Sequence, residues 1–340
     1  MSGQQDILNC SFSLWYENFK QDTVKSVVLK MPKAFKDYLL IDRVFVPNDA
    51  DNEREEPIGN LSHSLDELKT KEIFTNEEFL DFKSRVVTAI QTLGGKVFPK
   101  LNWSSPKDAS WVAVNGSLCC ENFSDICLLL KSSEFITHDL TNPFRIRDQD
   151  ENSDAADILH LEYTLVLRKW CDINASGEFR CFIRNKVLIA ISQRSLHHFS
   201  FIDLGKEMTV QSIRSFYKRH IKDRFPNSSY CLDLYLPGGN RKPVLIDFNP
   251  FVDVTDSLMF SWDELKGHKS MVEIEQGLAV QGVVFRSVPT EGVLSTDIRN
   301  SAYPLDFQQL ASGEDPAKLI DLLKLQQRAS SLTSSDSDLD

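Results

Sequence analysis

Residues 231–251 read CLDLYLPGGNRKPVLIDFNPF. This stretch contains two apolar runs, 230–236 and 244–248, on either side of the turn-forming Pro-Gly-Gly-Asn at 237–240. Short apolar runs separated by a few turn residues that include glycine are typical of a β-hairpin. The stretch therefore predicts two antiparallel strands in a buried sheet.

Three oxygen-bearing side chains of this hairpin form a candidate metal site. Asp247 and Asn249 are two positions apart, so on a strand both project from the same face, and Asp233 on the partner strand can face them. Carboxylate and amide oxygens are hard ligands of the type that Mg²⁺ takes, and Mg²⁺ usually keeps water and bridges to substrate phosphates. The alternative is a hairpin whose acids cap turns or face solvent, and the residues alone leave both interpretations open.

The fold class follows from the other predicted elements. A second hairpin is predicted at 179–183 and 187–192, and a further strand at 161–170. Hairpins with interspersed helices predict an α+β architecture built on antiparallel sheet. Apolar residues at helical spacing predict four helices: one after Thr75, one over 124–131, one over 210–225 and one after Gly313. Thr75 can cap the first of these helices, and Gly94-Gly95 ends it.

The domain organisation is predicted from polar stretches. The run Asp148–Asp157 predicts a boundary near residue 155 between two lobes. Many acids and few large apolar residues predict a flexible insertion at 48–72 and a disordered tail at 330–340. The expected units are an N-terminal lobe at 1–155, a lobe with the hairpin site at 156–300, and a C-terminal helix with its tail at 301–340.

Bulk properties restrict the function classes. The chain has 340 residues, of which 41% are hydrophobic, and a formal net charge of −11. An acidic balance argues against direct nucleic-acid binding. The seven cysteines include no C-x-x-C pair, so a structural zinc site is not expected. No run reaches the roughly 18 apolar residues of a membrane helix, and no signal peptide is recognisable, so a soluble cytoplasmic protein is expected.

Residues 98–111, FPKLNWSSPKDASW, form the second candidate site. Lys100 and Lys107 bracket a loop rich in proline and serine, with Trp103 between them. Such a loop offers ammonium groups, hydroxyls and backbone N–H groups to phosphates. The P-loop motif is absent. The alternative is that both lysines are merely exposed.

The third candidate site is the pair LRKWC at 167–171 and GEFRCF at 177–182. A strand, a short connector and a second strand could cover an adenine ring, and Arg180 could reach a phosphate. Gln193 and Arg194 similarly end an apolar strand. The alternative is that these are polar strand ends on a plain surface. No candidate covalent nucleophile has local sequence support.

Several long motifs together resemble one known family. They are FSLWY near the start, QTLGGKVFPKLNWSSPKDASW, LVLRKWC, GEFRCF, ISQR and LIDFNPF followed by VTDSL. In this order they resemble the cell division cycle protein 123 family from about Cys10 to Lys324. The resemblance implies an ATP-grasp fold, in which two α+β lobes clasp ATP with Mg²⁺. It also implies a cytosolic assembly factor that binds the gamma subunit of eukaryotic translation initiation factor 2, with an indirect role in the cell cycle.

The resemblance also implies roles for individual residues. Asp233, Asp247 and Asn249 would hold Mg²⁺ as well as line the nucleotide site. Two positions depart from the family pattern, with Ser105 in place of Ala and Lys107 in place of Arg, and lysine lacks the planar fork of arginine. The residues expected at the nucleotide, beyond these three, are Lys100, Trp103, Ser105, Lys107, Arg168, Lys169, Trp170, Glu178, Arg180 and Gln193.

Three functions remain open on this scaffold: a chaperone-like assembly factor, an ATP-grasp ligase and a kinase. The sequence shows metal-binding and phosphate-binding groups but no evident pocket for a second substrate, which favours the assembly factor. The segment SGEDPAKLIDLLKLQQ near the C-terminus is the local candidate for partner binding. Its apolar side could equally pack on the protein's own core. A monomer is expected.

Overall fold

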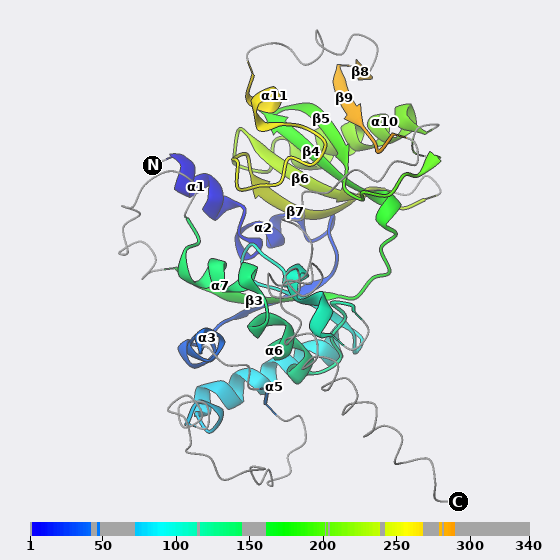
Figure 1. Ribbon diagram of the computed structural model, residues 1–340. Coiled ribbons are helices and arrows are strands. Elements are labelled where there is room, and N and C mark those ends of the chain that lie inside the picture. The colour runs from blue at the N-terminus through cyan, green and yellow to red at the C-terminus, as the bar shows by residue number, and fades with distance from the viewer. Residues whose placement is uncertain are drawn as a thin grey trace, which may run out of the picture.

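The computed structural model describes residues 2–41, 46–47, 72–113, 116–144, 161–200, 202, 205–238, 242–267, 279–280 and 282–289. Within them the chain forms a three-stranded and a six-stranded sheet. Figure 1 shows the larger sheet in the upper half and the helices of the smaller sheet in the lower half. Strand β3 (Thr164–Lys169) and helix α2 (Phe12–Phe19) lie between them.

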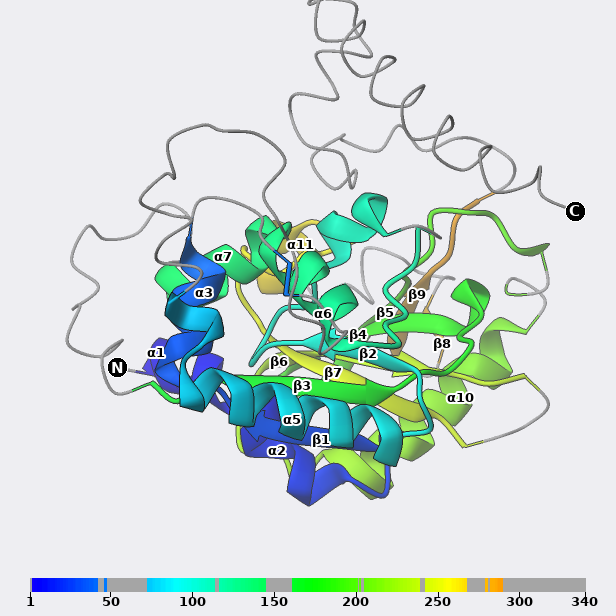
Figure 2. The same ribbon diagram turned by 90° about the horizontal axis from the view of Figure 1, so that it is seen from below.

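The smaller sheet consists of β1 (Ser26–Lys30), β3 and β2 (Val97–Lys100), in that order and all antiparallel. Helix α5 runs along this sheet in Figure 2 and contacts β1. The helices on this side are α3 (Lys33–Leu40), α5 (Glu77–Thr92), α6 (Phe123–Lys131) and α7 (Glu134–Thr141), with the 3₁₀ turn η1 at Lys107–Val112.

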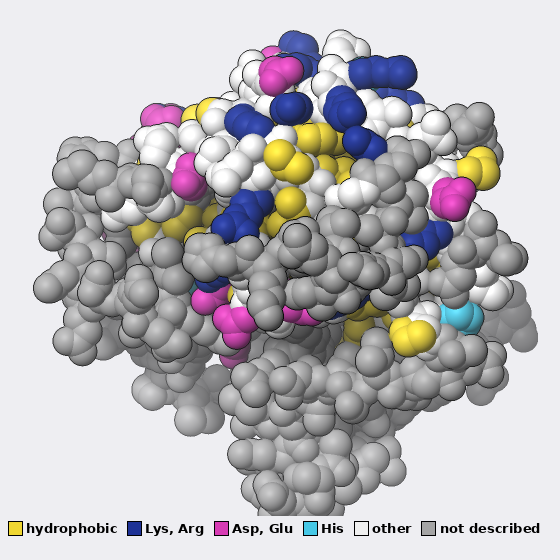
Figure 3. Space-filling view, turned by 90° about the horizontal axis from the view of Figure 1, so that it is seen from above, with side chains coloured by type: hydrophobic (Ala, Val, Ile, Leu, Met, Phe, Trp, Pro, Cys, Tyr) yellow, Lys and Arg dark blue, Asp and Glu magenta, His cyan; other side chains and the backbone are white. Residues whose placement is uncertain are grey.

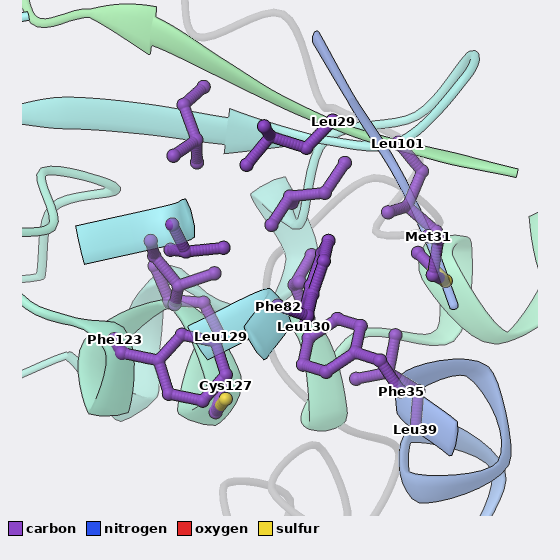
Figure 4. Close-up of a cluster of buried hydrophobic side chains, with 14 of the residues drawn as sticks. Leu29, Met31, Phe35, Leu39, Phe82, Leu101, Phe123, Cys127, Leu129 and Leu130 are labelled. Atoms are coloured by element: carbon purple, nitrogen blue, oxygen red, sulfur yellow. The ribbon is translucent and has the colours of Figure 1, made fainter. Parts of the chain in front are cut away.

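A core of buried aromatic and aliphatic side chains joins these helices to the smaller sheet (Figure 4). The ring centroid of Phe35 on α3 lies 4.8 Å from that of Phe82 on α5 and 5.8 Å from that of Phe123 on α6. Aromatic side chains bury large areas, and such pairs add to that stabilisation. The smaller sheet therefore has a hydrophobic core of its own, which fixes the position of the loop after β2.

The larger sheet contains both predicted hairpins. Its strand order is β7-β6-β4-β5-β9-β8, antiparallel except for the parallel pair β5 and β9. The two hairpins are adjacent because β4 also pairs with β6. The strands are β4 (Glu178–Arg184), β5 (Val187–Gln193), β6 (Tyr230–Tyr235), β7 (Val244–Pro250), β8 (Ala279–Val280) and β9 (Val283–Arg286).

Alternation along these strands gives the larger sheet two different faces. Phe179 and Cys181 belong to the face that packs against α2 and α10 (Lys206–Phe216). Arg180 and Phe182 belong to the opposite face, where Phe182 packs near α11 (Trp262–Lys266). The Arg180 side chain thus points away from the core that this sheet forms with α2 and α10. The remaining short elements are α1 (Ser2–Asn9), the 3₁₀ turn η2 (Ala175–Gly177) and the π-helical turn η3 (Tyr217–Ile221).

Two helix predictions need correction at their ends. Helix α5 is capped by Asn76, not Thr75, because the Asn76 side chain accepts a hydrogen bond from the Glu78 N–H at 2.9 Å. Gly94 and Gly95 do end it, both with positive φ. The helix predicted at 210–225 is present as α10 followed by η3, so regular α-helix already ends at Phe216. The helix predicted at 124–131 is confirmed as α6.

The predicted α+β class with mainly antiparallel sheets is confirmed. Each side of residue 155 contributes an element to the sheet of the other side. Strand β3 follows residue 155 but pairs with β1 and β2, and helix α2 precedes it but packs on the larger sheet. The division near residue 155 remains a prediction. None of the described helices is long and apolar enough to cross a lipid bilayer.

Several sequence predictions concern residues outside the described ranges. They are most of the acidic insertion at 48–72, the polar run 148–157, the helix after Gly313 and the tail at 330–340.

Although the chain has a formal net charge of −11, the basic side chains of the described residues are unevenly distributed over the surface. Seen from above, Lys and Arg side chains gather along one edge of the molecule (Figure 3).

Candidate phosphate and metal site

Strand register places a row of polar residues across the larger sheet. Ser192 on β5 pairs with Arg180 on β4, Arg180 with Asp233 on β6, and Asp233 with Asp247 on β7. Residues directly opposite each other in antiparallel strands project from the same face. The register shifts just after Asp233, an irregularity of the kind that re-aims side chains beside functional sites. Two carboxylates and an arginine therefore lie side by side on the face opposite α10.

Asp233 is buried and held by several donors. Its two carboxylate oxygens accept forked hydrogen bonds from Arg180, at 2.7 Å from Nε and 2.8 Å from Nη2. Arg194 Nη1 lies 2.5 Å from Oδ2, and Asn249 Nδ2 lies 3.1 Å from the same atom. Burial acts to raise the pKa of Asp233, but Arg180 and Arg194 outweigh it and hold that pKa well below its usual range. Asp233 is therefore ionised at neutral pH.

Asp247 is held by a lysine from the other sheet. The Nζ atom of Lys100, at the end of β2, lies 2.5 Å from Oδ2 of Asp247. The Lys100 side chain is only 2% exposed, whereas Asp247 is 18% exposed. Because 147 positions separate the two residues, this ion pair joins the loop after β2 to the hairpin β6–β7. The lysine-bearing loop and the predicted metal ligands thus lie together.

Lys107 extends the positive charge of this cluster. Its side chain is exposed, and no hydrogen bond or ion pair engages its ammonium group within the described part of the chain. The guanidinium of Arg194 and partial enclosure by the protein lower the pKa of Lys107 to about 8. Asp233 and Glu178 oppose that shift, so both lie within electrostatic range of the amine. Since water still reaches this lysine, repulsion by Arg194 is the main cause.

The loop between Lys100 and Lys107 is fixed by Asp139 of α7. The Asp139 carboxylate accepts hydrogen bonds from the Ser104 N–H at 2.8 Å and from its hydroxyl at 2.9 Å. Burial raises the pKa of Asp139 to about 6, although these bonds act against the shift. This contact was not predictable from the motif, because 35 positions separate Asp139 from Ser104.

Arg168 is turned toward β7 of the larger sheet. Its Nη1 donates to the backbone carbonyl of Ile246 at 2.9 Å, and its Nη2 donates to the Thr23 hydroxyl at 3.2 Å. The guanidinium is buried. The structure thus places Arg168 beside Asp247, with the Ile246 carbonyl and the Thr23 hydroxyl as its hydrogen-bond partners.

The other predicted residues have separate surroundings. Trp103 donates its indole N–H to the carbonyl of Ile7, and Ser105 is buried. Lys169 is exposed, and Trp170 donates to Asp172 at 3.2 Å. Gln193 is buried and donates to the carbonyls of Ser195 and His197. Within the described residues no hydrogen bond links these five side chains to the Asp233–Asp247 cluster, so their contacts with a nucleotide remain predictions.

Arg194 was named with Gln193 as a polar strand end but was not among the residues expected at the nucleotide, yet it binds Asp233 directly. The available signal was its position immediately after Gln193, at the end of the apolar strand β5. A charged residue at a strand end is more often a surface group, and only the pairing of β5 with β4 brings it to Asp233.

The cluster fits a magnesium–triphosphate group in charge and donor chemistry. Among the described residues, no group of three or more His, Cys, Asp or Glu side chains could hold a metal by itself. Two carboxylates and an amide leave positions in the Mg²⁺ coordination shell for phosphate oxygens. The Asn249 amide now directs its nitrogen at Asp233, and rotating the amide group by half a turn would direct its oxygen there instead. Cations outnumber carboxylates here: Lys100, Lys107, Arg168, Arg180 and Arg194 surround Glu178, Asp233 and Asp247.

Comparisons with known proteins agree on one family. A family model described as D123 matches residues 15–311. The translation initiation factor eIF2 assembly protein of Xenopus tropicalis is 42% identical over 334 residues, covering 95% of this chain and 96% of that protein. The protein of the same name from Dictyostelium discoideum is 34% identical, covering 92% and 94%.

A solved structure supports the same relationship. The structure of Cdc123 from Schizosaccharomyces pombe matches with a TM-score of 0.65 and 32% sequence identity, covering 83% of this chain and 96% of that chain. The motifs that carried the resemblance lie inside the range of the family model, apart from the first letters of FSLWY. These matches extend over nearly the full length of the relatives, so the chain belongs to the D123 family.

Proposed function

We propose that this protein binds ATP with Mg²⁺ at the Asp233–Asp247 cluster and acts as an assembly factor for eukaryotic translation initiation factor 2. The observation that carries the nucleotide part is the Lys100–Asp247 ion pair. This ion pair brings the lysine-bearing loop after β2 of the smaller sheet next to the carboxylate and amide oxygens of the larger sheet. A surplus of cations around two carboxylates suits a ligand that brings both a divalent cation and a larger negative charge.

The residues divide between two tasks. Asp233, Asp247 and Asn249 would hold Mg²⁺, which when bound neutralises phosphate charge. The ammonium groups of Lys100 and Lys107 would bind phosphate oxygens. Arg180 and Arg194 now bind Asp233, and their remaining donors are suited to phosphate oxygens as well.

The base of the nucleotide is proposed to lie near the connector between β3 and β4. This connector, residues 170–177, is the link from the smaller to the larger sheet. Lys169 is the last residue of β3 before it, Trp170 begins it, and Glu178 is the first residue of β4 after it. Glu178 and Gln193 lie at the paired ends of β4 and β5, since Gln193 pairs with Phe179. Trp103 and Ser105 belong to the loop that carries the two lysines.

The assembly role is proposed from the relatives, whose names describe eIF2 assembly proteins. The finer proposal is that the chain, as a cytoplasmic monomer, binds the gamma subunit of that factor. A ligase or a kinase is the alternative. Both need sustained turnover with a second substrate, whereas an assembly factor needs the nucleotide only to stabilise a binding conformation.

Calorimetry with the full chain tests this proposal. We expect ATP to bind in the presence of Mg²⁺ and much more weakly in excess chelator, and we expect the gamma subunit to be captured by the ATP-loaded protein. Phosphate release should stay low with and without the gamma subunit. Failure to bind ATP in Mg²⁺ would refute the nucleotide site. Sustained ADP release that depends on an added small acid or protein would favour the ligase or the kinase.

The affinity for ATP should fall as the pH rises through about 8. The pKa of Lys107 is about 8 in the free protein, and a bound phosphate raises it. Binding therefore takes up protons where the free amine is partly neutral, and linkage weakens binding there. Titrations in buffers of different ionisation enthalpy measure this uptake. Lys107→Met should bind ATP more weakly and lose this pH dependence, and an unchanged dependence would show that another group is responsible.

A further inference from the structure

The N-terminal segment connects the two sheets immediately before the candidate metal ligand Asp247. The backbone N–H of Leu245 on β7 donates to the carbonyl of Asp22 at 2.7 Å, and the Thr23 hydroxyl donates to the carbonyl of Leu245 at 2.6 Å. Because β7 is the edge strand of the larger sheet, this segment covers its free edge. Three residues later the same chain enters β1 of the smaller sheet.

Arg168 completes this connection from the smaller sheet. It lies on β3, where it pairs with Ser26 of β1, and its guanidinium reaches across to Thr23 and to the Ile246 carbonyl. Ile246 precedes Asp247 directly. Burial of Arg168 acts to lower its pKa, which the nearby Asp247 opposes. The guanidinium therefore fixes both the backbone and the electrostatic surroundings of Asp247.

The ring of Phe12 on α2 contacts both cations near Asp247, Lys100 and Arg168. Its ring centroid lies 5.2 Å from Nζ of Lys100 and 5.4 Å from Cζ of Arg168. A cation within about 6 Å of a ring face is attracted by the negative face of the ring. The ring is fully buried, and the Phe12 N–H donates to the carbonyl of Asn102 at 2.7 Å. Phe12 thus lies between the lysine loop and β3.

The far side of the segment is anchored independently. The buried Asp22 carboxylate binds Arg224 and Lys242, each at 2.7 Å, and His220 at 3.0 Å. His220 belongs to η3, Arg224 follows η3, and Lys242 lies two residues before β7. Residues 22 and 23 are therefore held on both sides, which leaves the Thr23 hydroxyl in a fixed position for Arg168.

We propose that Arg168 is a positioning residue, oriented by Thr23 and Phe12, that sets the position of Asp247 relative to Lys100. It acts through the backbone of β7, and this role is additional to the nucleotide contact that the resemblance implies for Arg168. This inference rests on the proposed ATP site, but it also makes a claim about the free protein. In the free protein, Arg168 and Thr23 hold the N-terminal segment on the edge of β7.

Arg168→Lys separates this role from a direct phosphate contact. Lysine keeps the charge but cannot donate to Ile246 and Thr23 in a fork. We expect the Kd for Mg²⁺–ATP to rise about tenfold, the order of one lost charge-assisted hydrogen bond. Hydrogen exchange of β7 peptides in the free protein, measured by mass spectrometry, should accelerate because Leu245 loses protection.

Thr23→Val removes the same contact from its other end. It also removes the Thr23 bond to the Leu245 carbonyl, and it should raise the Kd and accelerate β7 exchange in the same direction. In the double variant the two effects should be less than additive, because both changes remove the Arg168–Thr23 bond. Thr23→Ser keeps the hydroxyl and should behave like the wild type. The matched control is Thr164→Val, which removes a hydroxyl bonded to Asn102 at the other end of β3 and should leave both readouts unchanged.

Two outcomes would overturn the inference. One is an Arg168→Lys protein that binds ATP weakly while Thr23→Val changes neither affinity nor β7 exchange, which would leave Arg168 with a direct ligand contact and no positioning role. The other is normal β7 exchange in both variants. If the wild type itself fails to bind ATP, the proposed function fails, and the exchange measurements still decide whether Arg168 and Thr23 hold β7.

Discussion

Replacing Asp247 with alanine is expected to weaken Mg²⁺–ATP binding by well over tenfold, with each factor of ten corresponding to about 1.4 kcal/mol. The substitution removes one of the two carboxylates proposed to bind the cation. It also leaves the ammonium group of Lys100, which is 2% exposed, without its ion-pair partner. An unpaired buried charge is costly, so we expect Lys100 to move from its present position and to lose its alignment with the phosphates.

Two further variants identify the cause of the Asp247→Ala effect. Asp247→Asn keeps an oxygen at the site but removes its charge, so it should bind ATP better than the alanine variant and worse than the wild type. Asp253→Ala removes a carboxylate that is 58% exposed and pairs with Lys266, and it should bind ATP normally. Isothermal titration at fixed Mg²⁺ measures all three, and unchanged affinity in Asp247→Ala would remove Asp247 from the site.

Replacing Asp233 with alanine is expected to have the largest effect on stability. Asp233 is buried and neutralises Arg180 and Arg194, and the alanine variant leaves both guanidinium groups without this carboxylate. Removing one partner from a buried ion pair costs about 3–5 kcal/mol. The midpoint of urea unfolding should fall accordingly, and the folded fraction should lose Mg²⁺–ATP binding.

A more exposed ion pair provides the control for Asp233→Ala. Glu264 accepts from Arg286 at 2.7 Å, but their side chains are 34% and 24% exposed. Glu264→Ala should therefore cost less than Asp233→Ala, because water screens the remaining charge. Equal losses in the two variants would show that burial is not what makes the Asp233 cluster important.

The hairpin was predictable because its chemistry is local. Asp247 and Asn249 share a strand, and a short turn separates them from Asp233, so the period of two and the turn residues suffice to bring these side chains together. The motif did not indicate that the oxygens of Asp233 already bind Arg180 and Arg194. That finding depends on the pairing of β4 with β6, which no turn encodes.

The contacts between the sheets were beyond local patterns. Lys100 was chosen for its place in a loop, but its partner is 147 positions away. Strands β1 and β2 contain only 5 and 4 residues, too few for a clear period, and both pair with β3 from beyond the proposed boundary. The cap of α5 was misplaced by one residue because Thr75 and Asn76 are both good caps.

The central claim is that Asp233, Asp247 and Asn249 hold one divalent cation together with a triphosphate bound by Lys100 and Lys107. A crystal structure of the full chain with Mg²⁺ and a non-hydrolysable ATP analogue tests it most directly. We expect density for a cation within coordination distance of oxygens from Asp233, Asp247 and Asn249, with both lysines on phosphate oxygens. A nucleotide bound elsewhere, or a triphosphate at this cluster without a cation on these three side chains, would contradict it.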